Sequence, residues 1–234
     1  VYSYKGDLKK YFDIFGLKKN NFFTDVSNYI AYEMGQPTHC YDYLKVGSEL
    51  SLKNIDENCV FETLLNKKIQ VKGRNLVFLS GGNVINLAGV MGGKSTACSA
   101  ETRSAIVECA YFNPESILGK TVKYDIQSDA AHKFERNIDI NAQDYALRRF
   151  LKIITDHTEI KKAELFSQSY KEYKYKSIEL NVERINKIIG IDISEKEYIK
   201  LLNKLGFVIS ENKIVVPSYR TDVNTNNDLA EEIA

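Results

Sequence analysis

The sequence predicts an α+β fold in two domains, and three observations carry that prediction. Amphipathic stretches that end at glycines precede Val46. From Val46 to about Cys109, short apolar runs alternate with turn residues, which is typical of β-strands. After a return of helical periodicity, a polar stretch separates off a second, smaller set of elements. We therefore expect a mixed-sheet domain over residues 1–168, a linker over 169–176 and a small winged-helix-like α/β domain over 177–234.

Two helices are expected at the start of the first domain. Gly6 opens the first helix and Gly16 ends it, because glycine readily adopts the left-handed conformation that follows a helix. The apolar face of this helix comprises Leu8, Tyr11, Phe12 and Phe15. Asp25 is expected to cap the second helix, which ends at Gly35.

The rest of the first domain is expected to contain strands followed by helices. The clearest strands are residues 76–79, 84–90 and 105–110. Asn113-Pro114 indicates a helix start, since proline suits the first helical position. A longer helix is expected from about Asn141 to Thr155. Its expected buried face comprises Tyr145, Leu147, Phe150, Leu151 and Ile154.

The second domain is expected to follow a winged-helix pattern, with two short helices before a two-stranded wing. Its expected elements are a strand at 178–180, helices at 182–189 and 194–205, a hairpin of 207–209 with 214–216 around Glu211-Asn212, and a helix starting at Asp228. Ser194 and Glu197 have the spacing of a capping box. The preceding stretch SQSYKEYKYK is basic and aromatic; it is typical of a solvated linker, and stacking on RNA bases is the alternative.

The composition excludes several classes of protein. Lys and Arg number 32 against 31 acidic residues, so no overall basic field indicates a nucleic-acid partner. The four cysteines lack metal-ligand or disulfide-framework spacing, which favours reduced thiols in the cytosol. No His/Cys/Asp cluster has metal-ligand spacing, so we expect no metal site. The chain lacks an initial Met and stops within a helical pattern, so we expect it to be part of a longer protein.

Two residues stand out as chemical candidates. His39 follows a proline-restricted turn and is expected outside any helix, whereas His132 and His157 fall in helical stretches. Glu108 interrupts an apolar strand-like run. Without further context, a structural, hydrogen-bonded imidazole is the favoured interpretation of His39. A solvent-facing carboxylate is the favoured interpretation of Glu108. If Glu108 faces inward, it requires a hydrogen-bond donor, because an unpaired buried carboxylate is costly.

The glycine-rich segment 87–95 (LAGVMGGKS) superficially resembles a phosphate-binding loop. Gly89 lies four residues before Gly93, which is one residue too few for the GxxxxGK[ST] pattern. Close approach of the backbone to a ligand or to another strand fits these glycines better.

Six blocks of the chain resemble, in order, signatures of the β subunit of bacterial phenylalanyl-tRNA synthetase. The first blocks are 25–42 (DVSNYIAYEMGQPTHCYD, resembling DVTNYVMLELGQPLHAFD), 87–93 (identical to LAGVMGG) and 106–112 (IVECAYF, resembling LLE-A-FF). The others are 128–136 (SDAAHKFER, resembling TDAS-RFERG), 216–223 (VPSYRTDV, resembling VPSYRxDI) and 228–234 (DLAEEIA, resembling DLxEEIA). The blocks cover nearly the whole chain.

This resemblance implies an editing domain that hydrolyses tyrosine wrongly attached to phenylalanine tRNA. A hydrophobic pocket built for Phe cannot strongly reject a side chain that adds a hydroxyl, so a second pocket is needed. The resemblance implies that Glu108 reads the phenol hydroxyl and that His39 is the editing-site histidine, positioning a water or the terminal ribose. The other implied site residues are Asn28, Gly89, Ser128, Ala130 and Lys18.

Partners and location also follow from the resemblance. We expect tRNA(Phe) and a synthetase α subunit as partners, in a heterotetramer of two α and two β subunits, with no membrane and no DNA. ATP and Mg²⁺ are expected to serve the whole ligase elsewhere, with no cofactor in this part. The expected location is the cytoplasm.

The chain departs from the family pattern near the expected site. Lys18 stands where the family has Arg, and lysine cannot reproduce a bidentate fork. Ser128 stands where the family has Thr, and Phe22-Phe23-Thr24 replaces Asn-Val-Val. A catalytically silent scaffold that orients tRNA is the alternative function. A DNA-binding regulator would need a basic recognition helix, which the mixed charge of 182–205 does not provide.

Overall fold

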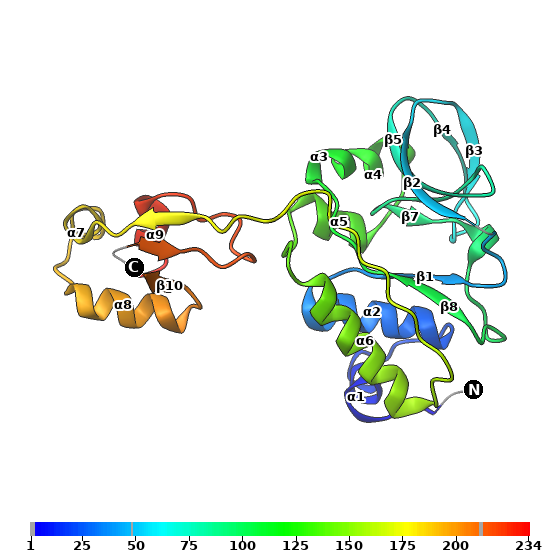
Figure 1. The fold of residues 1–234 in the computed structure, drawn as a ribbon, viewed down its shortest axis with the longest axis horizontal. Helices are drawn as coiled ribbons and strands as arrows, with labels where there is room; N and C mark the ends of the chain where they lie inside the picture. The colour runs from blue at the N-terminus through cyan, green and yellow to red at the C-terminus, as the bar shows by residue number, and fades with distance from the viewer. Residues whose placement is uncertain (1–2, 48, 211–212) are drawn as a thin grey trace. The chain divides into compact units, whose positions relative to one another are not determined.

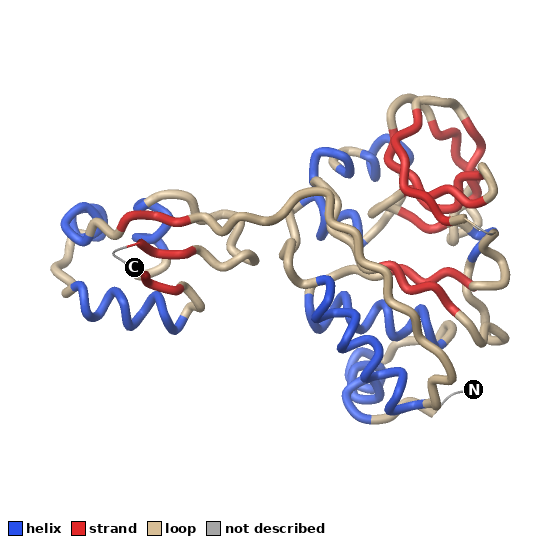
Figure 2. Tube along the Cα trace, in the orientation of Figure 1, coloured by secondary structure: helices blue, strands red, loops and turns tan. Residues whose placement is uncertain are grey.

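The computed structural model describes residues 3–47, 49–210 and 213–234, and its α+β architecture confirms the expected fold class. The chain forms two compact units (Figures 1 and 2). The first unit contains Val1–Ile138 and Ala142–Glu164, and the second contains Asp139–Asn141 and Leu165–Ala234. This division falls a few residues before the expected domain end at 168, and it groups residues 139–141 with the second unit.

Three helices form one side of the first unit: α1 (Gly6–Phe15), α2 (Phe22–Met34) and α6 (Gln143–His157). Gly16 and Gly35 follow α1 and α2 in the left-handed conformation, as predicted. The expected cap at Asp25 is wrong. Asn21 is the N-cap of α2 and accepts from the Thr24 backbone N–H at 3.0 Å, whereas Asp25 is buried and accepts from the Tyr4 hydroxyl.

The apolar faces of the helices were predicted only in part. Leu8 and Phe12 of α1 are buried, but Phe15 lies half exposed. In α6, Phe150 and Ile154 are buried as expected, together with Ala146 and Ile153. Tyr145 is 71% exposed and Leu151 is 41% exposed, so their expected burial is wrong. The buried stripe is therefore displaced by about one residue around the helix, toward the α1–α2 core.

The strands of the first unit form three small sheets. Strands β1 (His39–Asp42) and β8 (Ala105–Glu108) pair with each other, as do β3 (Cys59–Glu62) and β4 (Lys68–Val71). The third sheet has the order β2-β5-β6-β7, from β2 (Leu50–Ile55), β5 (Asn75–Ser80), β6 (Asn83–Leu87) and β7 (Met91–Gly92). All these pairings are antiparallel, so the expectation of a mixed sheet is corrected.

The β1–β8 pair lies between the other strands and the helices α1, α2 and α6 of the first unit (Figure 1). A hydrophobic core lies on each side of this pair. Tyr41 and Ile106 contribute to the core beneath the β-sheets, whereas Cys40 and Val107 contribute to the core of α1, α2 and α6. This division follows from the alternation of side chains along a strand. Three short helices also contribute to the sheet-side core: α3 (Pro114–Ile117), α4 (Lys120–Tyr124) and α5 (Asp129–Glu135). The 3₁₀ turn η1 (Lys94–Thr96) follows β7.

The second unit has the element order strand, helix, helix, hairpin, helix. These elements are β9 (Ser177–Glu179), α7 (Val182–Ile189), α8 (Glu195–Lys204), β10 (Val208–Ser210), β11 (Lys213–Val215) and α9 (Asn226–Glu231). The strands pair antiparallel in the order β10-β11-β9. The expected turn at Glu211-Asn212 lies outside the described residues. Helix α9 begins before Asp228, because Thr225 is the N-cap and Asp228 completes its capping box.

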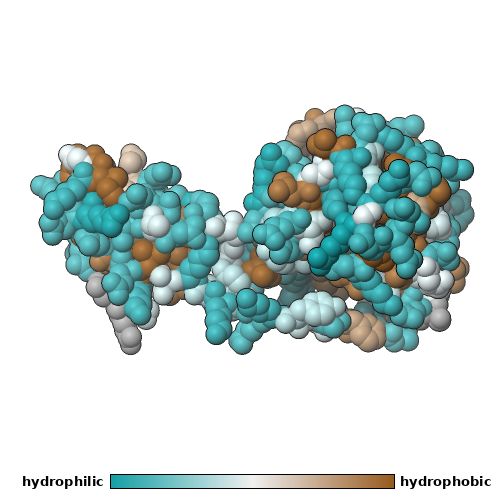
Figure 3. Space-filling model, turned by 90° about the horizontal axis from the view of Figure 1, so that it is seen from above, coloured by the Kyte–Doolittle hydropathy of each residue, from teal (hydrophilic) through white to brown (hydrophobic). Residues whose placement is uncertain are grey.

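The face seen in Figure 3 is mainly hydrophilic, with small apolar patches on each unit. All four cysteines are free thiols. Within the ranges described, no helix is both long and apolar enough to cross a membrane.

Candidate functional site

His39 and Glu108 are direct cross-strand partners in the β1–β8 pair. Opposed residues of an antiparallel pair project from the same face, with Cβ atoms about 4.5–5.5 Å apart. Tyr41 lies two residues along β1 and therefore shares this face. The face is the one that contacts the sheet-side core, since Tyr41 belongs to that core. The two residues singled out by the sequence are thus neighbours, although 69 positions separate them in the chain numbering.

The Glu108 carboxylate has the donor that its inward orientation requires. The Tyr41 hydroxyl donates to Glu108 Oε2 at 2.6 Å, and Asn86 Nδ2 donates to the Tyr41 hydroxyl at 2.7 Å. Burial raises the pKa of the Glu108 carboxyl from 4.5 to about 7, although the hydrogen bond from Tyr41 acts in the opposite direction. The solvent-facing interpretation of Glu108 is therefore wrong. Its carboxylate is a partly buried acceptor that faces the core, and its pKa lies near neutral.

The His39 ring is held as a neutral imidazole. Burial lowers its pKa from 6.5 to about 4. Its Nε2 atom is buried and lacks a hydrogen-bond partner among the described residues. The ring packs edge-on against Tyr41, with ring centroids 4.5 Å apart and planes at 77°. An unpaired buried nitrogen is costly in a folded protein, so this atom is available to a bound water or ligand.

Gly92 supplies the backbone surface against which His39 packs. A Cβ atom at Gly92 would lie 2.3 Å from His39 Cε1 and 2.8 Å from Nε2, so any side chain here would displace the ring. Sequence reasoning selected Gly89 instead. At Gly89, φ is +70° and a Cβ would meet Ile117 and Phe112, so the structural requirement for this glycine is core packing and backbone conformation. The pairing of β7 with β6 holds Gly92 in this place, and local sequence does not reveal that pairing.

Ser128 and Ala130 lie at the start of α5. The Ser128 hydroxyl caps the helix by accepting from the Ala131 backbone N–H at 3.1 Å, and it donates to the Val90 carbonyl at 2.5 Å. This bond ties α5 to the glycine-containing loop that leads into Gly92. Ala130 packs against the sheet-side core as a partly buried residue.

Asn28 and Lys18 lie on the helical side of the first unit. Asn28 is exposed on α2, next to the buried Ser27, whose hydroxyl donates to the Thr38 carbonyl at 2.6 Å. Lys18 is exposed in the loop between α1 and α2. Both side chains therefore extend toward solvent, and their expected contact with substrate stays a prediction.

Other polar groups in the structure have evident structural roles. His157 accepts from the Lys5 backbone N–H through Nε2 at 2.9 Å, and its Nδ1 lies 2.7 Å from the Ile153 carbonyl. His132 Nδ1 accepts from Arg136 at 2.9 Å. Within the described part of the chain, no group of three or more His, Cys, Asp or Glu side chains is arranged to hold a metal ion.

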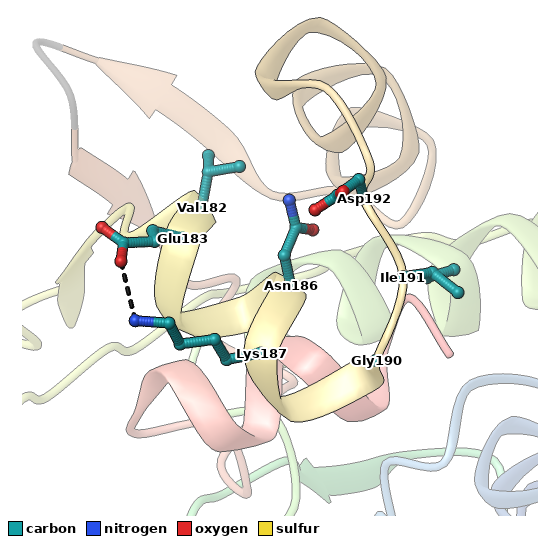
Figure 4. Close-up of a pocket in the computed structure, with 7 residues that line it drawn as sticks. All are labelled: Val182, Glu183, Asn186, Lys187, Gly190, Ile191 and Asp192. Carbon is teal, nitrogen blue, oxygen red and sulfur yellow. Dashed lines mark hydrogen bonds and ion pairs between the residues drawn. The ribbon is translucent and has the colours of Figure 1, made fainter.

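The second unit has a shallow hollow along α7, lined by Val182, Glu183, Asn186, Lys187, Gly190, Ile191 and Asp192 (Figure 4). The Asn186 amide is engaged at both ends, accepting from Tyr198 at 2.8 Å and donating to the Ile193 carbonyl at 3.1 Å. Lys187 pairs with Glu183 at 2.7 Å. The hollow contains none of the residues that the sequence singled out.

Comparisons with known proteins agree with the two-unit division. Residues 7–159 match the B3/4 domain family, and residues 178–234 match the tRNA synthetase B5 domain family. The chain is 33% identical to the phenylalanine–tRNA ligase beta subunits of Protochlamydia amoebophila and Coxiella burnetii, over 94% of its own length. It spans 28% of the length of each of these relatives.

A further relative is the same subunit from Psychrobacter arcticus, 29% identical over 94% of this chain and 28% of the relative. Among solved structures, an N-terminal fragment of the phenylalanyl-tRNA synthetase beta-subunit from Pyrococcus horikoshii matches 90% of this chain and 64% of the fragment. That match has 14% identity and a TM-score of 0.44. The chain belongs to the family of phenylalanine–tRNA ligase β subunits, of which it carries the B3/4 and B5 domains.

Proposed function

We propose that the first unit hydrolyses the aminoacyl ester of tyrosine wrongly attached to tRNA(Phe). The observation that carries this proposal is the register of β1 and β8, which places His39 and Glu108 opposite each other on one face. A partly buried acceptor, an imidazole nitrogen that has no hydrogen-bond partner in the described parts of the chain, and a bare glycine backbone meet there. This combination suits recognition of one small polar group within an otherwise apolar pocket.

Glu108 is the group that distinguishes tyrosine from phenylalanine in this proposal. A substrate phenol donates its hydroxyl proton to the carboxylate. Phenylalanine offers no donor, so its binding leaves a buried acceptor unpaired, which typically costs about 1–3 kcal/mol and more for a charged group. The correct product is thereby rejected by the same group that captures the wrong one.

We assign His39 to the same end of the bound tyrosine as Glu108. The aromatic ring of tyrosine separates its hydroxyl from its carbonyl, whereas the Cβ atoms of opposed strand residues are only about 5 Å apart. The neutral ring also makes His39 a weak base, because burial lowers its pKa to about 4. His39 Nε2 therefore serves as a second contact to the phenol hydroxyl or its bound water.

The other expected residues complete the pocket in this proposal. Ser128 holds the loop before Gly92 through the Val90 carbonyl, and Ala130 leaves room for an aromatic ring beside the core. Asn28 and the cation of Lys18 are exposed, which suits contacts with the tRNA rather than with the amino-acid side chain. Lys18 would contact phosphate as a point charge instead of a bidentate fork.

The activity of the whole ligase is proposed to reside outside this chain. Aminoacylation, with its ATP and Mg²⁺, is assigned to the α subunit, and tRNA(Phe) is the shared substrate. The second unit is proposed to be architectural, because α7 and α8 carry acidic and basic residues in mixture. A cytoplasmic location accords with this role in protein synthesis.

Deacylation by the complete ligase tests the proposal and separates the roles of the two residues. With Glu108→Gln or His39→Ala, we expect hydrolysis of Tyr-tRNA(Phe) to fall by about tenfold to a hundredfold, the loss of about 1.4–3 kcal/mol of hydrogen bonding. Hydrolysis of Phe-tRNA(Phe) should not fall with Glu108→Gln, because this substitution lowers the penalty that rejects Phe, and it should change little with His39→Ala, because His39 contacts no group that Phe has.

Two outcomes would contradict parts of the assignment. If His39→Ala slows both substrates equally, His39 acts at the ester and not at the hydroxyl. If both variants deacylate Tyr-tRNA(Phe) at the rate of the unaltered ligase, the site is a silent scaffold. Thermal unfolding of each variant controls for loss of folded protein.

A further inference from the structure

The buried phenol of Tyr41 has no role in the proposed recognition step, yet it contacts the group that performs it. Tyr41 is 0% exposed. Its hydroxyl lies between Asn86 Nδ2 at 2.7 Å and Glu108 Oε2 at 2.6 Å. The direction of donation is fixed, because an amide nitrogen only donates and an ionised carboxylate only accepts.

These three groups come from three different strands. Asn86 lies on β6, Tyr41 on β1 and Glu108 on β8. The chain of hydrogen bonds therefore ties the carboxylate to the four-stranded sheet as well as to its own strand partner. One carboxylate oxygen is held by Tyr41, which fixes the orientation of the other. Such second contacts give a recognition group a defined geometry before the substrate binds.

We propose that Tyr41 is a positioning residue that keeps Glu108 ionised and directs its second oxygen toward the hydroxyl of the substrate. This inference rests on the proposed editing function. The same bond would hold the carboxylate in place for any ligand with a hydroxyl donor, such as a tyrosine analogue with a displaced hydroxyl.

The need for such a residue follows from the surroundings of Glu108. Burial favours the protonated carboxyl, which is a poor acceptor, and the pKa of Glu108 lies at about 7 even though the hydrogen bond from Tyr41 lowers it. The other titratable groups near it are uncharged at neutral pH. Burial keeps His39 neutral, and burial raises the pKa of the Cys109 thiol to about 12 and that of Cys40 well above its usual value. Tyr41 is the donor that offsets this burial.

Tyr41 also stands where the family signature DVTNYVMLELGQPLHAFD has Phe. The Tyr41→Phe substitution therefore keeps the ring in a position that accepts it and removes only the hydroxyl. Tyr124→Phe is the matched control, since Tyr124 is a buried tyrosine of the same core whose hydroxyl donates to Asn75 Oδ1 at 2.9 Å. Asn86→Leu removes the donor to Tyr41 but leaves the Tyr41–Glu108 bond.

Carbon-13 NMR of the side-chain carboxyls in the complete chain tests the assignment without any substrate. With Tyr41→Phe, we expect the titration midpoint of Glu108 to rise by about one unit, as expected for loss of a hydrogen bond to the charged form. Asn86→Leu should raise the midpoint by less, because it only weakens the donor. Tyr124→Phe should leave it unchanged. A midpoint that stays or falls with Tyr41→Phe overturns the inference.

The pH dependence of deacylation by the complete ligase provides the functional readout. With Tyr41→Phe, hydrolysis of Tyr-tRNA(Phe) should fall about tenfold near pH 6 and recover near pH 9, where the carboxylate is ionised without help. Faster hydrolysis with Tyr41→Phe at neutral pH would instead show that Tyr41 competes with the substrate, and it overturns the inference. If the unaltered ligase does not hydrolyse Tyr-tRNA(Phe), the proposed function fails, and the NMR midpoints still decide the role of Tyr41.

Discussion

The two units of the chain differ in what they bury. The first unit buries polar side chains throughout its core: Asp25, Ser27, Gln36, Asp42, Thr63, Asn75, Ser80, Asn86, Thr96 and Thr102. In the second unit, Ser218 is the single buried polar residue among those described. Buried polar groups require specific partners, whereas an apolar core requires mainly the right volume. The core of the first unit therefore contains polar groups that could form a binding site, whereas the core of the second unit mainly stabilises its fold.

The ionisable groups follow the same division. In the first unit, burial shifts the pKa of Glu108 up to about 7 and that of His39 down to about 4. In the second unit, the main ionic cluster is Arg220 with Asp222 and Glu232, and hydrogen bonds from the guanidinium lower the pKa of both carboxyls. The first arrangement brings the pKa of Glu108 near neutral pH and keeps His39 uncharged there, while the second keeps the carboxyls of Asp222 and Glu232 ionised.

The largest expected effect comes from matched core substitutions, one in each unit. Ile185 and Ile117 are both 0% exposed. Replacement of either by alanine should lower the stability of its own unit by about 2–5 kcal/mol, measured by urea unfolding. The Ile117 side chain packs beside Gly89, in the loop that leads to Gly92. Ile117→Ala should therefore also impair hydrolysis of Tyr-tRNA(Phe) under conditions where the unit stays folded. Equal impairment by Ile185→Ala would contradict an architectural second unit.

The next largest effect is on the pH dependence of the unfolding free energy, to which Glu108 contributes. Its pKa is raised in the folded state, so the folded state binds more protons than the unfolded state between about pH 4.5 and 7. Its contribution to stability is therefore full below pH 4.5 and is lost as the pH rises to about 7. Glu108→Gln removes this loss. The unfolding free energy of the variant, minus that of the unaltered chain, should rise by up to about 3 kcal/mol across this range.

A control of opposite sign is available in the same unit. Arg149 donates to Glu33 at 2.7 Å and lowers the pKa of that carboxyl. Glu33 therefore contributes stability above its usual pKa and loses it as the pH falls. The unfolding free energy of Glu33→Gln, minus that of the unaltered chain, should therefore become more negative as the pH rises. If both variants show the same sign, the burial of Glu108 is not the cause of its titration.

Sequence periodicity predicted the second unit better than the first because its signals are local. Helix α7 begins and ends at the residues expected, since Asn181 caps its start and Gly190 its end. In the first unit, α2 starts earlier than expected because Asp25 is used by Tyr4, a partner 21 residues away. The buried face of α6 was predicted wrongly for a similar reason, because packing against α1 and α2 determines which of its side chains are buried.

The candidate site was reached through family resemblance more than through residue patterns. Glu108 and Tyr41 are 67 residues apart, and their hydrogen bond depends on a register that local periodicity cannot supply. His39 and Glu108 were each singled out as unusual, but the residues alone favoured unrelated structural roles. Tyr41 and Asn86 carried no signal, because a tyrosine and an asparagine in strand-like segments are common. Gly92 lies in the segment expected to approach a ligand or strand closely, but its contact with His39 could not be read from the sequence.

The smallest effect compares the same kind of helix cap in the two units. Asn21 caps α2 by accepting from the Thr24 backbone N–H at 3.0 Å, and Asn181 caps α7 by accepting from that of Arg184 at 2.9 Å. Loss of such a cap typically costs about 1 kcal/mol. Asn21 Nδ2 also donates to the Cys98 carbonyl at 3.2 Å, a contact across 77 residues.

Asn21→Ala should therefore destabilise its unit by about 1–2 kcal/mol, and Asn181→Ala its own unit by about 1 kcal/mol. Urea unfolding followed by a probe within each unit measures both changes. The Asn21 side chain bonds a distant carbonyl as well as its own helix, whereas the bond of the Asn181 side chain is to its own helix. Equal costs would mean that the Cys98 contact adds nothing, and that the two units differ in their cores but not in how their helices are capped.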